Sequence, residues 1–184
     1  KTTLIKSILG MVIPDSGSME FNQKSIFGDY LYREKIGYMP QIGRYPDTMT
    51  IGEIIEMVKK IRNSKDNLDE DLFRDFEIEK MLNKQMRTLS GGTTQKISAV
   101  LAFMFNPDVL ILDEPTAGLD PLAAEVLKEK IIKEKGKGKL IIITSHLLSE
   151  LDDLISEIIF MQEGKIFFHK KVNELREETQ EDKI

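Results

Sequence analysis

The stretch DVLILDEPTAGLD, residues 108–120, decides the fold. After its first residue, an apolar and β-prone run extends to Leu112 without a polar interruption, which is typical of a strand buried on both faces of a parallel sheet. Asp113 and Glu114 follow at once, and Pro115 ends the strand. Open α/β sheets bind ligands beyond the carboxyl ends of their strands, so the pattern places two carboxylates at a ligand-binding edge.

These two carboxylates allow two interpretations. In a nucleotide-hydrolysing protein, the first acid can hold Mg²⁺, directly or through water, and the second can orient an attacking water as general base. The alternative is a buried strand that surfaces at a charged loop. The choice between them depends on the motifs elsewhere in the chain.

Composition narrows the class of protein. The 184 residues suffice for one domain with a sizeable core, or for one domain that carries an insertion. A formal net charge of -5 and the lack of a local basic patch argue against nucleic acid as a partner. Cysteine is absent, so disulfides and thiolate metal sites are excluded, and a cytosolic location is permitted.

No apolar run approaches the ~20 residues of a membrane-spanning helix. Residues 4–13 resemble the apolar part of a signal peptide, but Lys6 interrupts them and no cleavage-like site follows, so we predict a buried helix there. The chain opens at Lys1 rather than at methionine, and we expect that an upstream segment has been removed.

The first three residues, Lys1, Thr2 and Thr3, match the end of a phosphate-binding loop, G-x-x-x-x-G-K-[ST], whose glycines would precede residue 1. In such a loop, backbone N–H groups and the lysine bind phosphate, and the hydroxyl holds Mg²⁺. The alternative is ordinary capping of a helix.

Short strands are predicted next. A turn at residues 14–17 leads to a strand or hairpin over residues 18–27, and Lys35 to Met39 forms another strand that Pro40 ends. Gln41, just beyond that strand, is placed to reach a metal or a water, although most such glutamines lie on the surface.

Residues 42–88 are predicted to be a helical insertion. Thr50 and Glu53 have the spacing of a capping box. Two helices are expected to bury apolar residues at helical spacing: Ile51, Ile54, Ile55, Val58 and Ile61 in the first, and Leu68, Leu72, Phe73 and Phe76 in the second. We expect the acidic residues between Asp66 and Glu79 to form a solvated face.

The stretch LSGGT, Leu89 to Thr93, precedes a helix whose apolar face holds Ile97, Val100, Leu101, Met104 and Phe105. Ser90, Gly91 and Gly92 leave several N–H donors free at that helix start, which favours an anion site. The alternative is a flexible start that the serine caps.

Beyond the central strand, Asp120 and Pro121 suit the cap and first position of another helix. Its inward residues are expected to be Leu122, Val126, Leu127 and Ile131. Residues 133–139 are expected to form a solvated basic turn. Leu140 to Thr144 is predicted to be a second buried strand, so His146 would lie at the same sheet edge as Asp113 and Glu114, a position suited to a γ-phosphate contact.

The C-terminal part is predicted to contain two strands, residues 156–162 and 165–169, joined as a hairpin at the sheet edge. A charged helix and tail, residues 170–184, would follow.

Taken in order, these motifs resemble those of the ATP-binding cassette (ABC) ATPase family. The resemblance covers essentially the whole chain and rests on KTT at residue 1, GYMPQ ending at Gln41, LSGGT, DVLILDEP, AGLD ending at Asp120, and TSH ending at His146. It implies an α/β fold of the P-loop NTPase type: a mainly parallel sheet flanked by helices. The ATPase core would comprise residues 1–41 and 89–184, and residues 42–88 would be a helical subdomain.

The resemblance also implies a role for each matching residue in binding ATP and Mg²⁺. Lys1 would contact the β and γ phosphates, Thr2 would ligate Mg²⁺, and Thr3 would contact phosphate. Gln41 would approach Mg²⁺ and the lytic water, and Asp113 would support the metal. Glu114 would be the general base, and His146 would touch the γ-phosphate. Ser90, Gly91 and Gly92 would cap the ATP of a second, head-to-tail ATPase subunit, and Asp120 would lie in the loop that links the two sites.

In transporters of this family, the dimer drives a membrane permease, contacted by the loop after Gln41 and by the insertion. Ile42, Tyr45, Pro46 and Met49 are the apolar residues expected at that contact, which would hold the chain at the cytoplasmic face of the membrane. LSGGT, the following TQK and DEPTAGLDP are similar to exporter-type cassettes with a separately encoded permease.

The chain departs from the family pattern at Thr93, where glutamine is common, and in lacking the glycines of the phosphate-binding loop and the adenine-stacking aromatic. Two alternatives remain. A soluble ABC ATPase of translation or DNA repair would need a second cassette or a long coiled coil, and neither is seen. A non-hydrolysing interaction module would have no physical reason to keep Gln41, Glu114 and His146.

Overall fold

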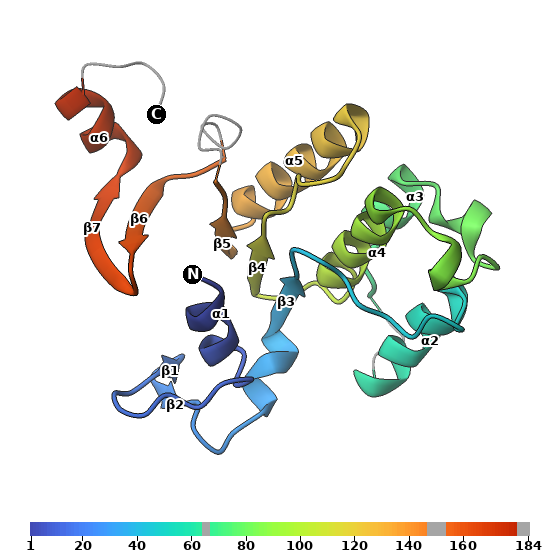
Figure 1. Ribbon diagram of the computed structural model, residues 1–184, viewed down its shortest axis with the longest axis horizontal. Helices are drawn as coiled ribbons and strands as arrows, with labels where there is room; N and C mark the ends of the chain where they lie inside the picture. Colours follow the sequence, from blue (N-terminus) through green and yellow to red (C-terminus); the bar gives the residue numbers. More distant parts are fainter. Residues whose placement is uncertain (64–66, 147–153, 180–184) are drawn as a thin grey trace.

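A three-stranded parallel sheet lies at the centre of the computed structural model, which describes residues 1–63, 67–146 and 154–179. Its strands are β3 (Ile36–Met39), β4 (Val109–Asp113) and β5 (Leu140–Thr144), with β4 in the middle (Figure 1). β4 is the apolar run predicted from the sequence, and the predicted α/β class with a parallel sheet is confirmed.

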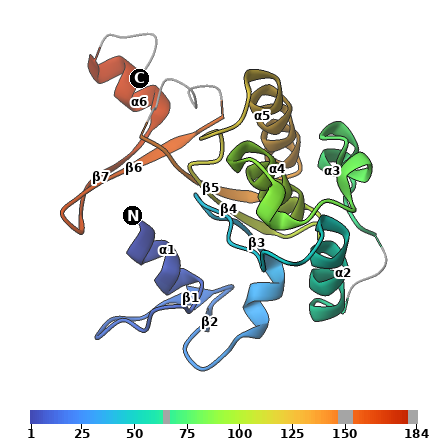
Figure 2. The same cartoon turned by 45° about the vertical axis from the view of Figure 1, so that its right-hand side comes forward.

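Helices cover both faces of this sheet, which explains why the middle strand is apolar without alternation. Leu110 and Leu112 pack with α4 (Gly91–Phe103) and α5 (Pro121–Gly136). Ile111 points to the opposite face and packs with α1 (Thr2–Ile8). Figure 2 shows α4 and α5 on one side of the sheet and α1 on the other, together with the small hairpin of β1 (Glu20–Phe21) and β2 (Lys24–Ser25).

The prediction of one buried helix over residues 4–13 is wrong in its length. α1 ends at Ile8 and Leu9 caps it; Ile5 and Leu9 are buried in the core, and Ile8 packs against it while partly exposed. Met11, Val12 and Ile13 are exposed in the turn that follows. An apolar run therefore does not extend this helix, because the chain reverses at Gly10 and must then lead into the β1–β2 hairpin.

The segment between β3 and α4 is helical. It contains α2 (Ile51–Ile61), α3 (Asp71–Asp75) and the 3-10 turns η2 (Ile78–Met81) and η3 (Met86–Thr88). The capping box at the start of α2 is present, with the Thr50 side chain and the Glu53 side chain each accepting from the other's backbone N–H. The second predicted helix shrinks to the short α3, although Leu72 and Phe76 are buried as expected.

Hydrogen bonds from Arg62 connect the end of α2 to the sheet. Its guanidinium donates to the backbone oxygens of Glu34 at 3.0 Å and Ile36 at 2.9 Å, and it lies 5.0 Å from the centre of the Phe105 ring. Burial lowers the pKa of Arg62, against a smaller opposing effect from Glu34. Beyond Arg62, Asp69 donates its backbone N–H to the Met104 oxygen at 2.8 Å.

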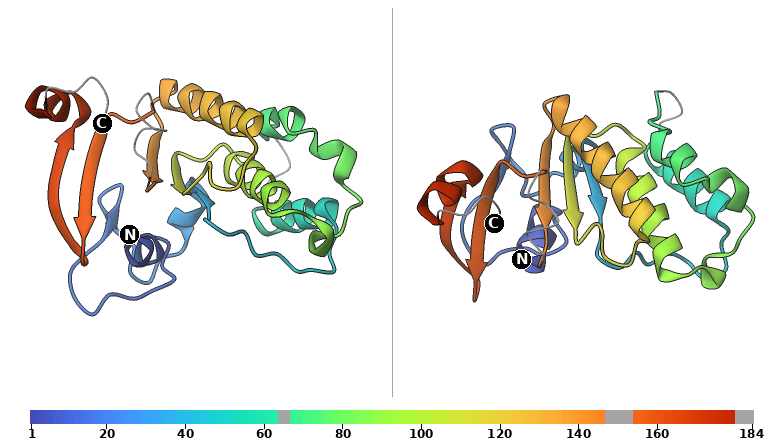
Figure 3. Two further views of the ribbon diagram at one scale, coloured as in Figure 1. Left: turned by 45° about the horizontal axis from the view of Figure 1, so that its top comes forward. Right: turned by 90° about the horizontal axis from the view of Figure 1, so that it is seen from above.

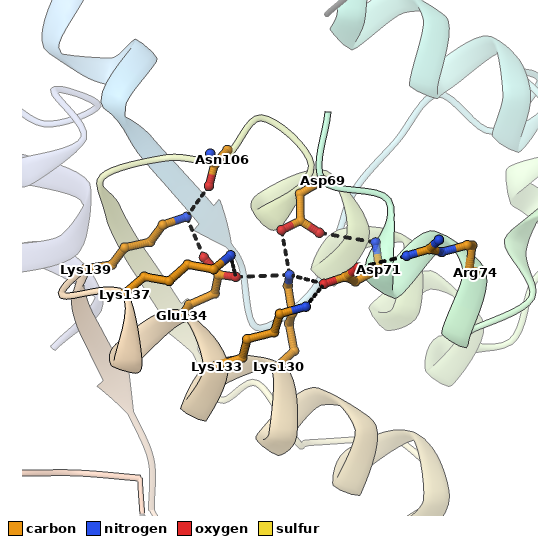
Figure 4. A network of polar contacts seen from close by, with 9 residues as sticks. All are labelled: Asp69, Asp71, Arg74, Asn106, Lys130, Lys133, Glu134, Lys137 and Lys139. Carbon is orange, nitrogen blue, oxygen red and sulfur yellow. Dashed lines mark hydrogen bonds and ion pairs between the residues drawn. The ribbon is translucent and has the colours of Figure 1, made fainter. Parts of the chain in front are cut away.

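The acidic face of this region is solvated only in part: Glu70, Asp75, Glu77 and Glu79 are exposed, as predicted, whereas Asp69 and Asp71 are partly buried, contrary to the prediction. Lys130 of α5 has only 3% of its side chain exposed and contacts Asp69 at 2.5 Å, Asp71 at 2.8 Å and Glu134 at 3.0 Å (Figure 4). The supposed basic turn begins inside α5, and Lys137 and Lys139 contact Glu134. Asp66 lies outside the described residues.

Electrostatic effects within this cluster follow its geometry. Burial opposes ionisation of Glu134, but the ammonium groups of Lys137, Lys139 and Lys130 outweigh it and lower the pKa of Glu134 to about 2. Contacts from Lys130 and Lys133 lower the pKa of Asp71. Burial alone would lower the pKa of Lys130, and its carboxylate partners raise it instead. Asp71, Lys130 and Glu134 therefore stay ionised at neutral pH, and the cluster joins the segment between β3 and α4 to α5.

The C-terminal strands form a sheet of their own. β6 (Glu157–Gln162) and β7 (Lys165–Lys171) pair antiparallel, as predicted, and α6 (Val172–Thr179) follows. This hairpin is hydrogen-bonded within itself and is not a continuation of the parallel sheet (Figure 3), so its predicted place at the sheet edge is wrong. β5 is consequently an edge strand that is only half-buried, and Leu140 is exposed.

Two predictions of inward-facing residues are also wrong. Ile61, in the last turn of α2, and Leu122, in the first turn of α5, are both exposed. Each lies at a helix end, where the helix has passed beyond the core that buries its middle turns. Within the described ranges, no helix is long and apolar enough to cross a membrane.

Candidate functional site

The carboxyl ends of the three parallel strands meet at one edge of the sheet. In the observed register, Met39 lies beside Leu112, and Asp113 lies beside Thr144. The residues that follow β3, β4 and β5 are therefore neighbours at this edge, as expected for Gln41, Glu114 and His146. Gln41 is exposed directly beyond β3.

Asp113 is buried at the end of β4. Side chains alternate along a strand, so Asp113 shares the face of Ile111, which is the face that α1 covers. The Thr144 hydroxyl donates a hydrogen bond to the Asp113 carboxylate. Burial, and then the negative charge of Asp113, raises the pKa of Tyr38 on β3. The carboxylate is thus held on the side of the sheet where α1 begins.

Glu114 has an unusual backbone. Its φ is 51°, in the left-handed region that side chains rarely adopt, while its N–H donates to the Thr144 oxygen at 3.1 Å and its own oxygen accepts from Ala117 at 3.1 Å. The side chain is 14% exposed, and its Oε1 lies 3.4 Å from Nε2 of His146, which is 78% exposed. The turn directs the second carboxylate toward the histidine.

Lys1 reaches the same edge from the other end of the chain. Its Nζ donates to the backbone oxygen of Ser145 at 3.0 Å, next to His146. Thr2 and Thr3 form the first turn of α1 and are exposed. The N-terminus lies next to the sheet in Figure 1, as this contact requires. The structure therefore brings Lys1, Glu114 and His146 together.

The predicted magnesium ligands match the chemistry of that ion. The hydroxyl of Thr2, the amide of Gln41 and the carboxylate of Asp113 are oxygen ligands, which Mg²⁺ prefers. The buried Asp113 and the start of α1 lie on the same face of the sheet, so the residues present fit a magnesium site.

The LSGGT stretch makes a different set of contacts. Ser90 caps α4: its Oγ accepts from the backbone N–H of Thr93 at 3.2 Å and lies 2.9 Å from the Thr93 hydroxyl. The serine cap is thus observed, and Ser90 and Gly91 remain exposed. The contacts of Ser90 are confined to the first turn of α4, whereas those of Glu114 lie at the sheet edge.

Asp120 caps α5, as predicted, and also binds a residue that the sequence did not indicate. Its Oδ1 accepts from the Ala123 N–H at 2.9 Å, and its Oδ2 lies 2.7 Å from Nζ of Lys96. Lys96 and, in second place, the Ala123 N–H lower the pKa of Asp120. No local pattern marks Lys96, because its partner lies 24 residues further along the chain.

Comparison with known proteins identifies this arrangement. A family profile described as "ABC transporter" matches residues 1–117, which is more than half of the chain. The chain belongs to the ABC transporter family. The relatives described next are ATP-binding proteins of this family. The family as a whole binds and hydrolyses ATP.

One relative is the ABC transporter ATP-binding protein YhaQ of Bacillus subtilis, 32% identical over 180 residues, covering 96% of this chain and 60% of YhaQ. Another is the Nod factor export ATP-binding protein I of Ralstonia nicotianae, 29% identical, covering 95% of this chain and 56% of that protein. The chain thus spans less than two thirds of both relatives.

A solved structure, the ATP-binding subunit of an ABC transporter, superposes with a TM-score of 0.89 at 26% identity. The match covers 98% of this chain and 77% of the other. This ABC fold agrees with the parallel sheet and flanking helices described above.

Proposed function

We propose that the chain is the ATP-hydrolysing subunit of an ABC exporter. The observation that carries the proposal is the convergence of Lys1, Glu114 and His146 at the carboxyl edge of the sheet, with Oε1 of Glu114 3.4 Å from the histidine and Lys1 bound to the adjacent Ser145. A cation, a carboxylate and an imidazole at one edge match the needs of phosphoryl transfer to water.

Each residue of this edge has a proposed role. Lys1 and Thr3 bind phosphate oxygens, and His146 contacts the γ-phosphate. Glu114 accepts a proton from the attacking water, which the Gln41 amide helps to orient, and its limited exposure keeps bulk water from competing. Thr2, Asp113 and Gln41 hold Mg²⁺. When bound, that ion neutralises charge that develops on the phosphate oxygens.

ATP is proposed to close two subunits head to tail. Ser90, Gly91 and Gly92 of one subunit contact the ATP of the other, and Asp120 lies in the loop between the two sites. The exposure of Ser90 and Gly91 supports this arrangement, because it leaves them available to a second subunit. Only intact ATP contacts both subunits, so hydrolysis removes the interactions that favour closure.

The helical segment 42–88 is proposed as a subdomain that meets a separate membrane permease, with residues 1–41 and 89–184 as the ATPase core. Ile42 and Pro46 are the exposed apolar residues for this contact. Tyr45 is half-buried with its hydroxyl 3.0 Å from Ser98, and Met49 packs against the core. The permease would hold the chain at the cytoplasmic face. The Nod factor relative's name supports export.

The test of this proposal is Glu114→Gln in the full-length protein. We expect turnover to fall by about a thousandfold, because the amide cannot accept the proton, while MgATP binding stays within about twofold and a dimer accumulates with ATP. ATP hydrolysis is measured beside MgATP binding by calorimetry. Near-normal turnover would refute the role of Glu114, and a parent protein without turnover would favour the non-hydrolysing interaction module.

A further inference from the structure

Two loops assigned to different tasks touch each other in this fold. The LSGGT loop (residues 89–93) and the AGLD loop (residues 117–120) meet where Gly92 faces Gly118. A Cβ atom added to Gly92 would lie 2.7 Å from the Gly118 oxygen, closer than real contacts allow. At this point the two backbones are so close that only a residue without a side chain fits at position 92.

Lys96 joins the same two loops through charge. It lies in α4 beyond the LSGGT loop, and its Nζ is 2.7 Å from Oδ2 of Asp120, the last residue of the AGLD loop. The two carboxylate oxygens of Asp120 have different partners, because Oδ1 caps α5 by accepting a hydrogen bond from the Ala123 N–H. The contact with Lys96 is thus additional to the cap and is not needed to start α5.

The ammonium group of Lys96 also faces the helical insertion. Nζ lies 5.8 Å from the centre of the Phe76 ring, and Phe76 is buried in the core that the insertion shares with α4. A cation at this distance from an aromatic face is attracted to it. Only 24% of the Lys96 side chain is exposed, so the group is partly withdrawn from solvent between Phe76 and Asp120.

We propose that Lys96 is a positioning residue that makes the LSGGT and AGLD loops move as one unit and ties that unit to Phe76 of the insertion. The inference rests on the proposed function, in which LSGGT contacts the partner subunit's ATP and the insertion meets the permease. When ATP engages one loop, the ion pair carries the other loop to the dimer face in the same displacement. Lys96 touches no ATP itself.

The experiment uses Lys96→Met in the full-length protein, since methionine removes the charge and keeps an unbranched chain. Monomer MgATP binding should stay within about twofold. The ATP concentration for half-maximal dimerisation, measured in the Glu114→Gln background, should rise about tenfold, and the Hill coefficient of hydrolysis should fall toward one. Lys96→Arg should restore both. Lys128→Met is the matched control, because Lys128 is similarly exposed, at 27% of its side chain, and lies 3.8 Å from Glu125.

A double-mutant cycle tests whether Lys96 acts through Asp120. Asp120→Asn keeps a good helix cap and removes the charge, so the Lys96→Met/Asp120→Asn protein should behave like either single variant. Additive effects, or a lower melting temperature with an unchanged Hill coefficient, would overturn the proposal. A Glu114→Gln parent that fails to dimerise with ATP would refute the proposed function itself, whereas a parent that dimerises and a Lys96→Met variant that matches it would refute this inference alone.

Discussion

Glu114 combines a strained backbone with an interior position at the end of the most buried strand. A residue other than glycine at a φ of 51° costs about 1–3 kcal/mol relative to ordinary conformations. The hydrogen bonds to Thr144 and from Ala117 hold this conformation, and it turns the carboxylate toward His146. Asp113, one residue earlier, keeps the regular strand geometry and points to the α1 face. Two adjacent acids thus reach different surroundings.

Lys130 offers the sharpest test of a single buried charge. Lys130→Met leaves Asp69, Asp71 and Glu134 facing one another without the central ammonium, so we expect the free energy of unfolding to fall by about 3–5 kcal/mol. Urea denaturation measures this change. Lys128→Met is the control, because its long, partly exposed contact with Glu125 is worth about 0.5 kcal/mol or less. A loss below about 1 kcal/mol for Lys130→Met would show that Lys133, Lys137 and Lys139 can replace it.

At the scale of elements, β3 and α4 are packed as closely as their backbones allow. A Cβ atom at Gly37 in β3 would lie 2.1 Å from the Ala102 oxygen of α4 and 2.8 Å from the Pro107 side chain. The close fit fixes the position of β3, and with it the point from which Gln41 emerges beyond the strand.

We therefore predict that Gly37→Ala destabilises the protein by about 1–3 kcal/mol, because a methyl group must push α4 away from the sheet. Thermal unfolding should show a melting temperature lower by about 2–4 °C for each kcal/mol. Gly136→Ala is the matched control. Among the described residues, nothing outside its own stretch of helix lies within 4 Å of the added Cβ in the last turn of α5, so this change should raise stability by up to about 1 kcal/mol. Equal effects of the two changes would contradict the close packing.

At the scale of the whole molecule, the LSGGT loop and the sheet edge are proposed to serve different ATP molecules. Ser90 caps α4 and is exposed, and Lys1, Glu114 and His146 gather at the carboxyl edge. A bulky cation at Ser90 should then affect association of two subunits and leave a single subunit's own nucleotide site unchanged.

We predict that Ser90→Arg in the full-length protein abolishes ATP-dependent dimerisation, with monomer MgATP binding within about twofold of the parent. Size-exclusion chromatography with light scattering, in the Glu114→Gln background, gives the first readout, and calorimetry gives the second. Ser90→Thr keeps the cap and serves as control. If Ser90→Arg removed binding to the monomer, the assignment of the LSGGT loop to the partner's ATP would be wrong.

The sequence alone determined the local features of this protein. The unbroken apolar run before Asp113 predicted the buried central strand, Thr50 with Glu53 predicted the start of α2, and Asp120 with Pro121 predicted the start of α5. Each of these depends on residues within a few positions of one another, which propensity and capping rules describe directly. The order of the motifs was enough to suggest the family.

Only the tertiary structure decided which distant residues meet. Lys1 reaches Ser145, Lys96 reaches Asp120, and Lys130 is buried among carboxylates that the sequence assigned to a solvated face. The separate β6–β7 sheet and the exposed end of the α1 segment were likewise decided by packing. The physical reason is that burial, and therefore the strength of a charge contact, depends on what lies across the core. A pattern along the sequence does not show which residue lies across the core.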